Sequence, residues 1–218
     1  ICTDKTGTLP QNRMEVQSCH GQQKPLVTAL ALCTDAELLP DGTAQGEATE
    51  CALVEYAARL GLRKAALAAA QPRVAELPFD SERKCMSTFH KQGSGIIQYT
   101  KGAPDVLLQK CTHWMQDGQP RPLTQADRSR ILAENRRMAA QALRVLAAAC
   151  RSWEKLPAPL TPAAAENQLV FLGLVGMLDP VRPQVPGAVR ACRSAGIRTV
   201  MITGDHPDTA AAIGRTLG

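Results

Sequence analysis

The sequence predicts an α/β protein with a discontinuous architecture, in which an α+β domain is inserted into part of a doubly wound domain. Short apolar strands at residues 1–4 and 198–202 each end in residues that can carry chemistry. The helix, strand, turn and helix expected after residue 184 make up half of a doubly wound parallel sheet. The middle of the chain instead indicates antiparallel strands with helices. We therefore expect residues 1–10 and 179–218 to form the partial outer domain and residues 11–178 the inserted one.

The first half of the chain alternates between helix and strand signals. Pro25 opens an apolar helix, since proline is favoured in a first helical turn. Apolar residues then recur at helical spacing, and Gly61 stands where a glycine commonly ends a helix. Two strand-like runs flank a Gly-rich hairpin connection at residues 92–95. The elements expected up to residue 100 are a buried strand 1–4, helices 25–32 and 47–60, and strands 74–79, 86–90 and 96–100.

The second half begins with helices and ends with the second half of the outer domain. Thr124 and Asp127 form a capping pair at the start of a long helix. The composition of the Ala-rich segment 142–150 favours a helix, although a strand remains an alternative. An apolar run over 169–178 is too short for most helices and predicts a buried strand. The Pro-rich segment 179–183 predicts a hinge. The other elements expected are helices 103–111, 124–140, 185–195 and 207–217 and strand 198–202.

Charge, cysteine content and hydropathy narrow the class of protein. The formal net charge of +5 suits a polyanionic partner, but dispersed basic residues without interleaved aromatics do not predict nucleic-acid binding. Eight cysteines at irregular spacing, with no C-x-x-C pair, indicate free thiols in a reducing compartment and no zinc site. The longest uncharged apolar run is about half of the ~20 residues that a membrane helix needs. We expect a soluble fragment that begins within a strand, at Ile1, and carries no signal peptide.

The string Asp4-Lys5-Thr6-Gly7-Thr8 directly follows the first apolar strand. Ligands of open α/β sheets bind at the carboxyl ends of strands, which would expose Asp4 to a bound phosphate. Gly7 and the two hydroxyl side chains allow a tight turn whose backbone N–H groups face an anion. A carboxylate can also serve as a covalent nucleophile in phosphoryl transfer. The alternative is that Asp4 only caps a turn.

A second string, Thr203-Gly204-Asp205, follows the strand expected over 198–202 and opens a helix. A helix N-terminus after a glycine turn is a ready anion site. The alternative is an ordinary turn with Asp205 near the helix cap. The two strings can converge on one phosphoryl group only if both strands share a sheet, so we expect strands 1–4 and 198–202 to be neighbours.

Taken together with further motifs, these strings make the chain resemble the P-type ATPases. Residues 1–9 (ICTDKTGTL) are similar to the phosphorylation signature, and residues 177–182 and 201–205 match two later motifs. Residues 46–50 (GEATE) and 101–104 (KGAP) match nucleotide-domain signatures of the type II branch. The resemblance covers essentially the whole chain. It favours bacterial calcium pumps, with sodium–potassium pumps as the alternative, and it favours a strand over the Ala-rich segment 142–150.

The resemblance implies a pump that uses ATP and Mg²⁺ and phosphorylates itself on Asp4, within a haloacid-dehalogenase-like phosphorylation domain. The Asp4 carboxylate and the Thr6 carbonyl would hold Mg²⁺. Thr203 would bind phosphoryl oxygens, and Asp205 would lie near nucleotide and metal. A phosphatase of the same superfamily is an alternative, but Thr6 replaces the acid that activates water there. The implied catalytic residues are Asp4, Lys5, Thr6, Thr203, Gly204 and Asp205.

The resemblance also implies a nucleotide site in the inserted domain. Phe79 would stack on adenine, Glu50 would bind the adenine edge, and Arg144 would reach the phosphates. Taken alone, Phe79 would instead be a core aromatic and Lys101 a solvated hairpin end. Ser81 departs from muscle-type calcium pumps, which carry an arginine there, and Pro10 replaces the usual threonine. The implied nucleotide-binding residues are Glu50, Phe79, Lys84, Lys101, Gly102, Arg144 and, at the hinge, Asp179.

The implied parent is a multi-pass protein of the cell membrane, with this segment on the cytoplasmic side. Its partners would be ATP, other pump domains of the same chain and a cation transported through a membrane domain, but not nucleic acid. The isolated segment is expected to bind nucleotide weakly and not to turn over. A non-catalytic nucleotide-sensing or docking module is the remaining alternative.

Overall fold

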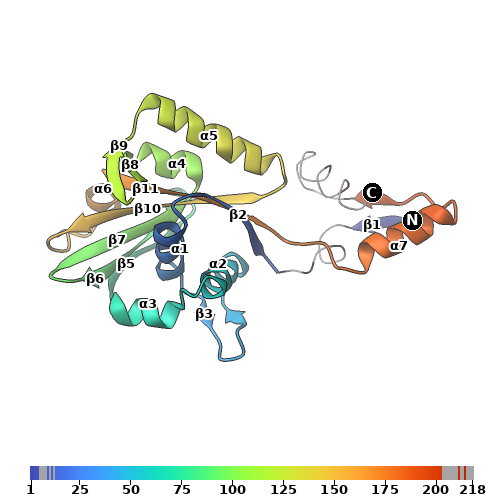
Figure 1. The fold of residues 1–218 in the computed structure, drawn as a ribbon, viewed down its shortest axis with the longest axis horizontal. Helices are drawn as coiled ribbons and strands as arrows, with labels where there is room; N and C mark the ends of the chain where they lie inside the picture. Colours follow the sequence, from blue (N-terminus) through green and yellow to red (C-terminus); the bar gives the residue numbers. More distant parts are fainter. Residues whose placement is uncertain (5–8, 10, 12, 203–210, 212–213, 215–218) are drawn as a thin grey trace.

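The computed structural model describes residues 1–4, 9, 11, 13–202, 211 and 214, without the side chains of residues 3 and 4. Figure 1 shows a larger body built around a sheet and a smaller lobe beside it. The lobe contains β1 (Cys2–Asp4), α7 (Val185–Ser194) and β12 (Val200–Ile202). No helix in the described part of the chain has the length and apolar character needed to cross a bilayer.

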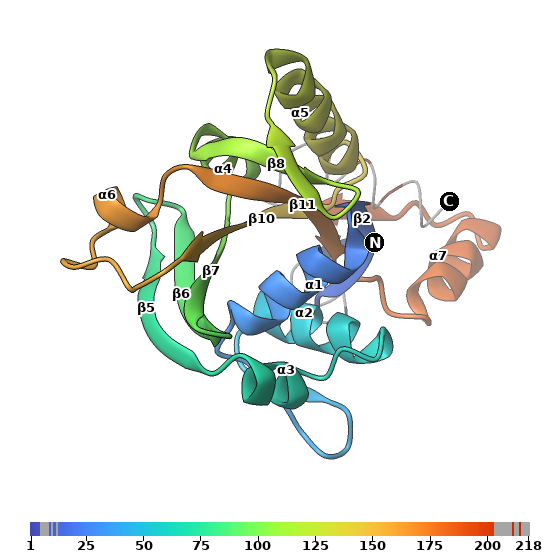
Figure 2. The ribbon, with the colours of Figure 1, turned by 60° about the vertical axis from the view of Figure 1, so that its left-hand side comes forward.

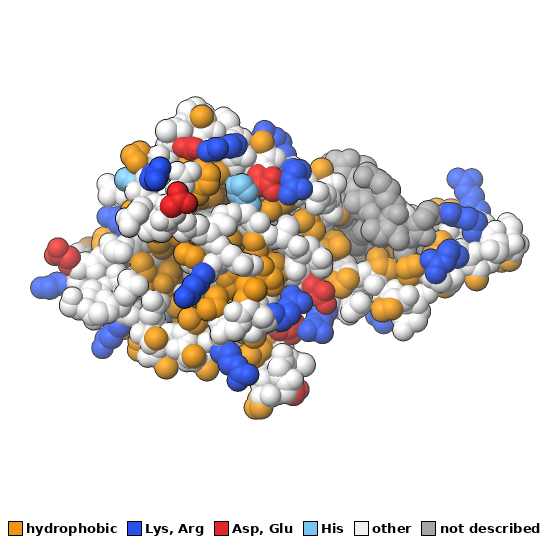
Figure 3. Space-filling view, in the orientation of Figure 1, with side chains coloured by type: hydrophobic (Ala, Val, Ile, Leu, Met, Phe, Trp, Pro, Cys, Tyr) orange, Lys and Arg blue, Asp and Glu red, His pale blue; other side chains and the backbone are white. Residues whose placement is uncertain are grey.

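The first and last described strands pair with each other. β1 and β12 are parallel, with Cys2 opposite Val200 and Asp4 opposite Ile202. This pairing confirms the prediction that the two strands are neighbours. The prediction that residues 1–4 form a buried strand is wrong at its start, because Ile1 is 63% exposed and Cys2 is exposed as well. Figure 3 shows hydrophobic side chains at the surface of this lobe. The helix expected over 207–217 lies outside the described residues apart from 211 and 214.

The larger body contains an eight-stranded sheet in the order β5-β6-β7-β10-β11-β8-β9, with β2 also paired to β11. Neighbouring strands are antiparallel apart from the parallel pair β11–β8, so the expected antiparallel sheet contains one parallel step. The strands are β2 (Glu15–Gly21), β5 (Arg73–Asp80), β6 (Cys85–Gln92), β7 (Gly95–Gly102), β8 (Cys111–Gln116), β9 (Gln119–Pro122), β10 (Arg144–Trp153) and β11 (Leu169–Leu178).

Helices cover the two faces of this sheet (Figures 1 and 2). One face carries α1 (Gln23–Leu32), α2 (Ala48–Arg59) and α3 (Lys64–Ala70), and the other carries α4 (Pro104–Gln109) and α5 (Gln125–Ala139). A short helix, α6 (Pro162–Ala165), precedes β11, and a small hairpin of β3 (Glu37–Leu38) and β4 (Ala44–Gln45) precedes α2. The sheet therefore separates two hydrophobic cores.

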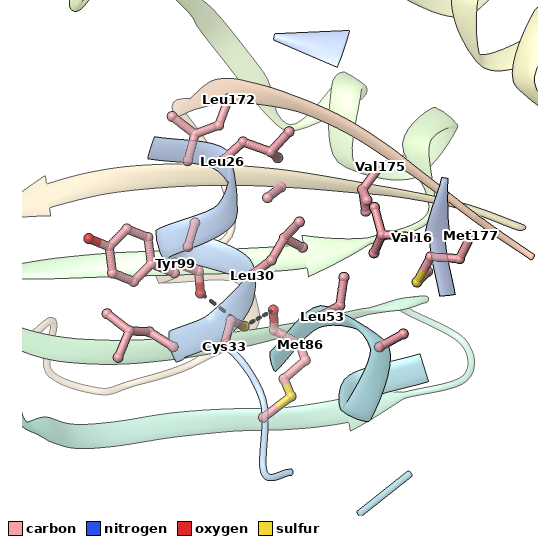
Figure 4. Close-up of a cluster of buried hydrophobic side chains, with 14 of the residues drawn as sticks. Val16, Leu26, Leu30, Cys33, Leu53, Met86, Tyr99, Leu172, Val175 and Met177 are labelled. Atoms are coloured by element: carbon pink, nitrogen blue, oxygen red, sulfur yellow. Dashed lines mark hydrogen bonds between the residues drawn. The ribbon is translucent and has the colours of Figure 1, made fainter. Parts of the chain in front are cut away.

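The core beneath α1 and α2 joins helix side chains to the strands. Figure 4 shows Leu26 and Leu30 of α1 facing Leu172 and Val175 of β11. At the end of α1 the buried Cys33 thiol lies 3.5 Å from two strand carbonyl oxygens and donates to the backbone there. The second core packs α4 and α5 against the opposite face of β10 and β11. Burial of this apolar area on both faces stabilises the sheet.

Local signals account for where several elements begin and end. Glu47 caps α2 by accepting hydrogen bonds from the backbone N–H groups of Thr49 and Glu50. Thr124 and Asp127 form the expected capping box of α5. The Ala-rich segment forms strand β10, so the helix that its composition favours is wrong. Its alanines are buried alternately against the two cores, which outweighs their helix propensity.

Two chain segments connect the body with the lobe, and hydrogen bonds join them. The Gln11 N–H donates to the Pro180 carbonyl at 3.0 Å, and the Arg182 N–H donates to the Leu9 carbonyl at 2.8 Å. Close by, the Arg13 N–H donates to the Asp179 carboxylate at 3.3 Å. The hinge predicted at 179–183 thus lies in this double connection. The domain boundaries at residues 10 and 179 remain predictions.

Candidate functional site

A cavity of about 550 Å³ opens where α2, the turn between β5 and β6, the end of β7 and the start of β10 meet. Six of the seven residues expected to bind nucleotide line it, and they come from separate segments of the chain. Asp179 is the exception, since it lies at the connection to the smaller lobe. The lining residues are Glu47, Thr49, Glu50, Phe79, Lys84, Lys101, Gly102, Ala103, Arg144, Val145 and Leu146.

Phe79 supplies an aromatic wall of the cavity. It lies near the end of β5, and 64% of its surface is exposed. The interpretation of Phe79 as a core aromatic is therefore wrong. An exposed ring beside a cavity offers an apolar face on which a planar ring can stack, at centroid distances of roughly 4.5–7 Å. This geometry suits the stacking role that the sequence suggested, which remains a prediction.

Lys101 and Glu50 form a mostly buried ion pair in the cavity wall. Lys101 lies near the end of β7 away from the hairpin turn and is 8% exposed, so the solvated-hairpin interpretation is wrong. Its ammonium group donates to one carboxylate oxygen of Glu50. The other oxygen accepts hydrogen bonds from the backbone N–H groups of Asp35 and Ala36, at 2.8 and 3.1 Å. Glu50 thus holds Lys101 in place, a task that its sequence position did not indicate.

Lys84 and Gly102 meet backbone to backbone beside the cavity. Lys84 has a φ of +52°, in the left-handed region, at the end of the β5–β6 turn. A Cβ atom on Gly102 would lie 2.5 Å from the Lys84 carbonyl oxygen and 2.6 Å from the Cys85 Cβ. Only glycine therefore lets β7 approach the turn this closely. The group that approaches Gly102 in this structure is the backbone of the β5–β6 turn.

The cavity combines an aromatic ring with cationic groups. Lys84, Lys101 and Arg144 bring three positive charges to its lining, and Glu47 and Glu50 bring two negative ones. Glu47 caps α2 and Glu50 binds Lys101, so that Lys84 and Arg144 are the lining cations that form no ion pair with another described residue. Cationic side chains form strong charge-assisted hydrogen bonds with phosphate oxygens. The arrangement can hold a flat ring at Phe79 and a polyanionic chain at the cations.

The expected catalytic residues fall at the edge of the described chain. The backbone of Asp4 ends β1, beside Ile202 at the end of β12. The carboxyl ends of these parallel strands lie at one edge, which is where the predicted phosphoryl site would form. Lys5, Thr6, Thr203, Gly204 and Asp205 lie outside the described residues, and so does the side chain of Asp4.

Comparison with known proteins identifies the family. A family model described as P-type ATPase, cytoplasmic domain N, matches residues 22–184, and the chain belongs to this family. It is 41% identical to calcium-transporting ATPase 1 of Bacillus cereus and 38% identical to calcium-transporting ATPase 1 of Lactococcus lactis. It is 36% identical to the calcium-transporting ATPase lmo0841 of Listeria monocytogenes. These matches cover 100% of this chain but only 26%, 26% and 27% of the relatives, so the chain spans about a quarter of their length.

Proposed function

We propose that the chain binds ATP in the cavity between α2, β7 and the β5–β6 turn, as the nucleotide-binding part of a P-type cation pump. The observation that carries the proposal is the convergence of six residues, selected from sequence alone, on one cavity. Phe79 stacks on the adenine ring, Lys84 and Arg144 neutralise phosphate charge, and Lys101, held by Glu50, contacts the nucleotide from the cavity wall. The names of the relatives favour Ca²⁺ as the transported ion.

In the parent protein, Asp4 is the residue that receives the γ-phosphoryl group. The parallel pairing of β1 and β12 supports this role, because it brings the Asp4 backbone beside the strand that leads into Thr203, Gly204 and Asp205. A haloacid-dehalogenase-like phosphorylation domain has this strand arrangement. An Asp4 carboxylate oxygen forms a bond to the γ-phosphorus as the bond to ADP breaks, and water later releases phosphate from the aspartyl phosphate.

Magnesium would be held by the Asp4 carboxylate and the Thr6 carbonyl oxygen, and it would neutralise phosphate charge during transfer. Lys5 and Thr203 contact the phosphoryl oxygens in this proposal, and Asp205 lies near the nucleotide. The parent pump lies in the cell membrane, with this segment on the cytoplasmic side. The transported cation passes through a membrane domain, which communicates with this segment in the same chain.

Titration of the chain with ATP, followed by NMR, tests the nucleotide site. We expect shifts concentrated at residues around Phe79 and Lys101, and we expect Phe79→Ala to weaken binding by about tenfold, in line with the ~1–3 kcal/mol of a base–aromatic stack. Val74→Ala is the matched control, because Val74 is an exposed apolar residue of the same strand that does not line the cavity. The absence of ATP-induced shifts around Phe79 and Lys101 would exclude this site and favour a docking module.

A further inference from the structure

Two side chains of the cavity lie at the turn between β5 and β6: Phe79 near the end of β5 and Lys84 at the end of the turn. Within the turn, the Asp80 carboxylate accepts hydrogen bonds from the backbone N–H groups of Glu82 and Arg83, each at 2.9 Å. The Lys84 N–H donates to the Asp80 carbonyl at 2.7 Å. These contacts close the turn upon itself. Outside the turn, the Ala103 N–H donates to the Lys84 carbonyl at 3.0 Å, and a side chain of the turn makes a further attachment to the rest of the protein.

Arg83 supplies this attachment from outside the cavity lining. One end of its guanidinium group donates to the backbone carbonyl of Pro78, the residue before Phe79. The other end donates to the carboxylate of Glu166, which directly follows α6 and lies 83 residues further along the chain. A planar guanidinium group with donors in fixed directions orients both of its partners at once. Arg83 therefore ties the backbone beside Phe79 to a distant segment.

Glu166 is an immobile anchor for this tie. Its side chain has no exposed surface. One carboxylate oxygen accepts a hydrogen bond from the Ser87 hydroxyl at 3.0 Å, and the other accepts one from the Cys85 thiol at 3.3 Å. The Lys110 ammonium group lies 3.6 Å from the same carboxylate. Because a buried carboxylate without partners is strongly destabilising, Glu166 stays where these groups hold it.

We propose that Arg83, through its ion pair with Glu166, is a positioning residue that orients Phe79 and Lys84 toward a nucleotide in the cavity. The proposal rests on the proposed ATP-binding function. A buried ion pair adds little stability over an apolar pair of similar volume, because desolvation offsets the attraction between the charges. Its contribution here is directional, since it fixes the turn that presents the aromatic ring and the ammonium group.

The three phenylalanines of the chain provide a selective probe of this turn. Phe79 is 64% exposed, whereas Phe89 and Phe171 are fully buried. Protein labelled with para-fluorophenylalanine therefore gives one fluorine NMR signal from the end of β5 beside the turn and two from the interior. The Phe79 signal reports the orientation of the turn, and the Phe171 signal on β11 serves as an internal reference for the core.

The test measures fluorine spectra and ATP affinity for Arg83→Gln, Glu166→Gln and the double variant. Each single variant is expected to move the Phe79 signal, to leave the Phe171 signal in place and to weaken ATP binding by about fivefold, within the range of measured couplings. The double variant is expected to bind no more weakly than either single variant, because both changes break the same tie. Arg137→Gln removes an exposed arginine–glutamate pair of 2.6 Å on α5 and, as the matched control, should change neither readout.

Three results would overturn the proposal. The first is unchanged affinity in the variants, and the second is weakened binding with an unmoved Phe79 signal. The third is an additive loss in the double variant, which would mean that Arg83 contacts the nucleotide itself. Where a single variant fails to fold because it leaves a buried charge unpaired, the double variant still decides the first two outcomes, through its ATP affinity and its Phe79 signal. The unmodified chain tests the underlying function separately, since ATP that leaves its Phe79 signal unmoved contradicts nucleotide binding in this cavity.

Discussion

The ammonium group of Lys101 on β7 is held by the carboxylate of Glu50 on α2, and the second oxygen of that carboxylate binds two backbone N–H groups of the loop after α1. One carboxylate thereby joins a helix, a strand and a loop at the wall of the cavity. The side chains of Lys101 and Glu50 are only 10% and 15% exposed. Solvent therefore screens this pair less than it screens the pairs at the surface.

Glu50→Ala is expected to lower the free energy of unfolding by about 3 kcal/mol, because it leaves a mostly buried ammonium group and two N–H groups without their partner. Denaturant unfolding measures the change. Glu134→Ala, which removes an exposed pair with Arg137 on α5, should cost less than about 1 kcal/mol. Equal losses in the two variants would show that burial of the Glu50–Lys101 pair has no energetic consequence.

Gly102→Ala is expected to destabilise the chain by about 2 kcal/mol, since the new methyl group would overlap the Lys84 carbonyl and Cys85. Thermal unfolding checks this expectation. Gly187→Ala in α7 is the control, because among the described residues beyond its own helix a methyl group there meets no atom within 4 Å, and alanine favours helices. If the Gly102→Ala variant were as stable as the parent chain, the β5–β6 turn would be able to move away from the new methyl group without a loss of folding free energy.

Stability is expected to fall as the pH drops from about 6.5 to about 4, because burial lowers the pKa of His90 to about 4. His90 contacts the Gln71 carbonyl and the Thr88 hydroxyl, each at 2.9 Å. In this pH window the unfolded imidazole binds a proton that the folded one does not, so acid favours unfolding by up to about 3 kcal/mol. Denaturant unfolding as a function of pH measures this slope. His90→Gln should flatten it and His113→Gln should not, while a slope unaffected by His90→Gln would assign the effect to other groups.

Alkylation by iodoacetamide at about pH 8 is expected to modify Cys2 first and to spare Cys33, Cys85 and Cys111 by about a hundredfold or more, since thiolates react and buried thiols resist ionisation. Cys2 is exposed, whereas these three are buried. Burial raises the pKa of Cys111 to about 12, and burial together with the Glu166 charge does the same for Cys85. Peptide mass spectrometry follows the modification. In concentrated guanidinium chloride the difference should vanish, and rapid labelling of Cys85 in the native chain would contradict its burial.

Elements with strong local signals could be predicted, and elements fixed by distant partners could not. The capping box of α5 and the helix of α2 before Gly61 appeared as expected. The strand β2 escaped prediction because its sequence, EVQSCHG, has no clear alternation, and pairing with β11 stabilises it instead. The short Ala-rich helix α3 and the hairpin of β8 and β9 escaped prediction as well.

In the candidate site, too, features marked by a local sequence string could be predicted, whereas features that depend on distant partners could not. Phe79, Lys101 and Gly102 were found because they stand in short contiguous strings, and the fold brings them to one cavity. The pairing of Arg83 with Glu166 joins residues 83 positions apart, and no local pattern marks it. The engagement of Glu50 by Asp35 and Ala36 depends likewise on how α2 packs beside the loop after α1. Tertiary contacts of this kind are invisible to motif reasoning.

The double connection between the body and the lobe has a mechanical consequence. A single connecting segment would let the body and the lobe rotate freely relative to one another. Here two segments run side by side and are joined by the backbone hydrogen bonds Arg182–Leu9 and Gln11–Pro180. A pair of joined segments bends more easily than it twists. Two hydrogen-bonded segments therefore restrict twisting of the body about the lobe more than a single segment would.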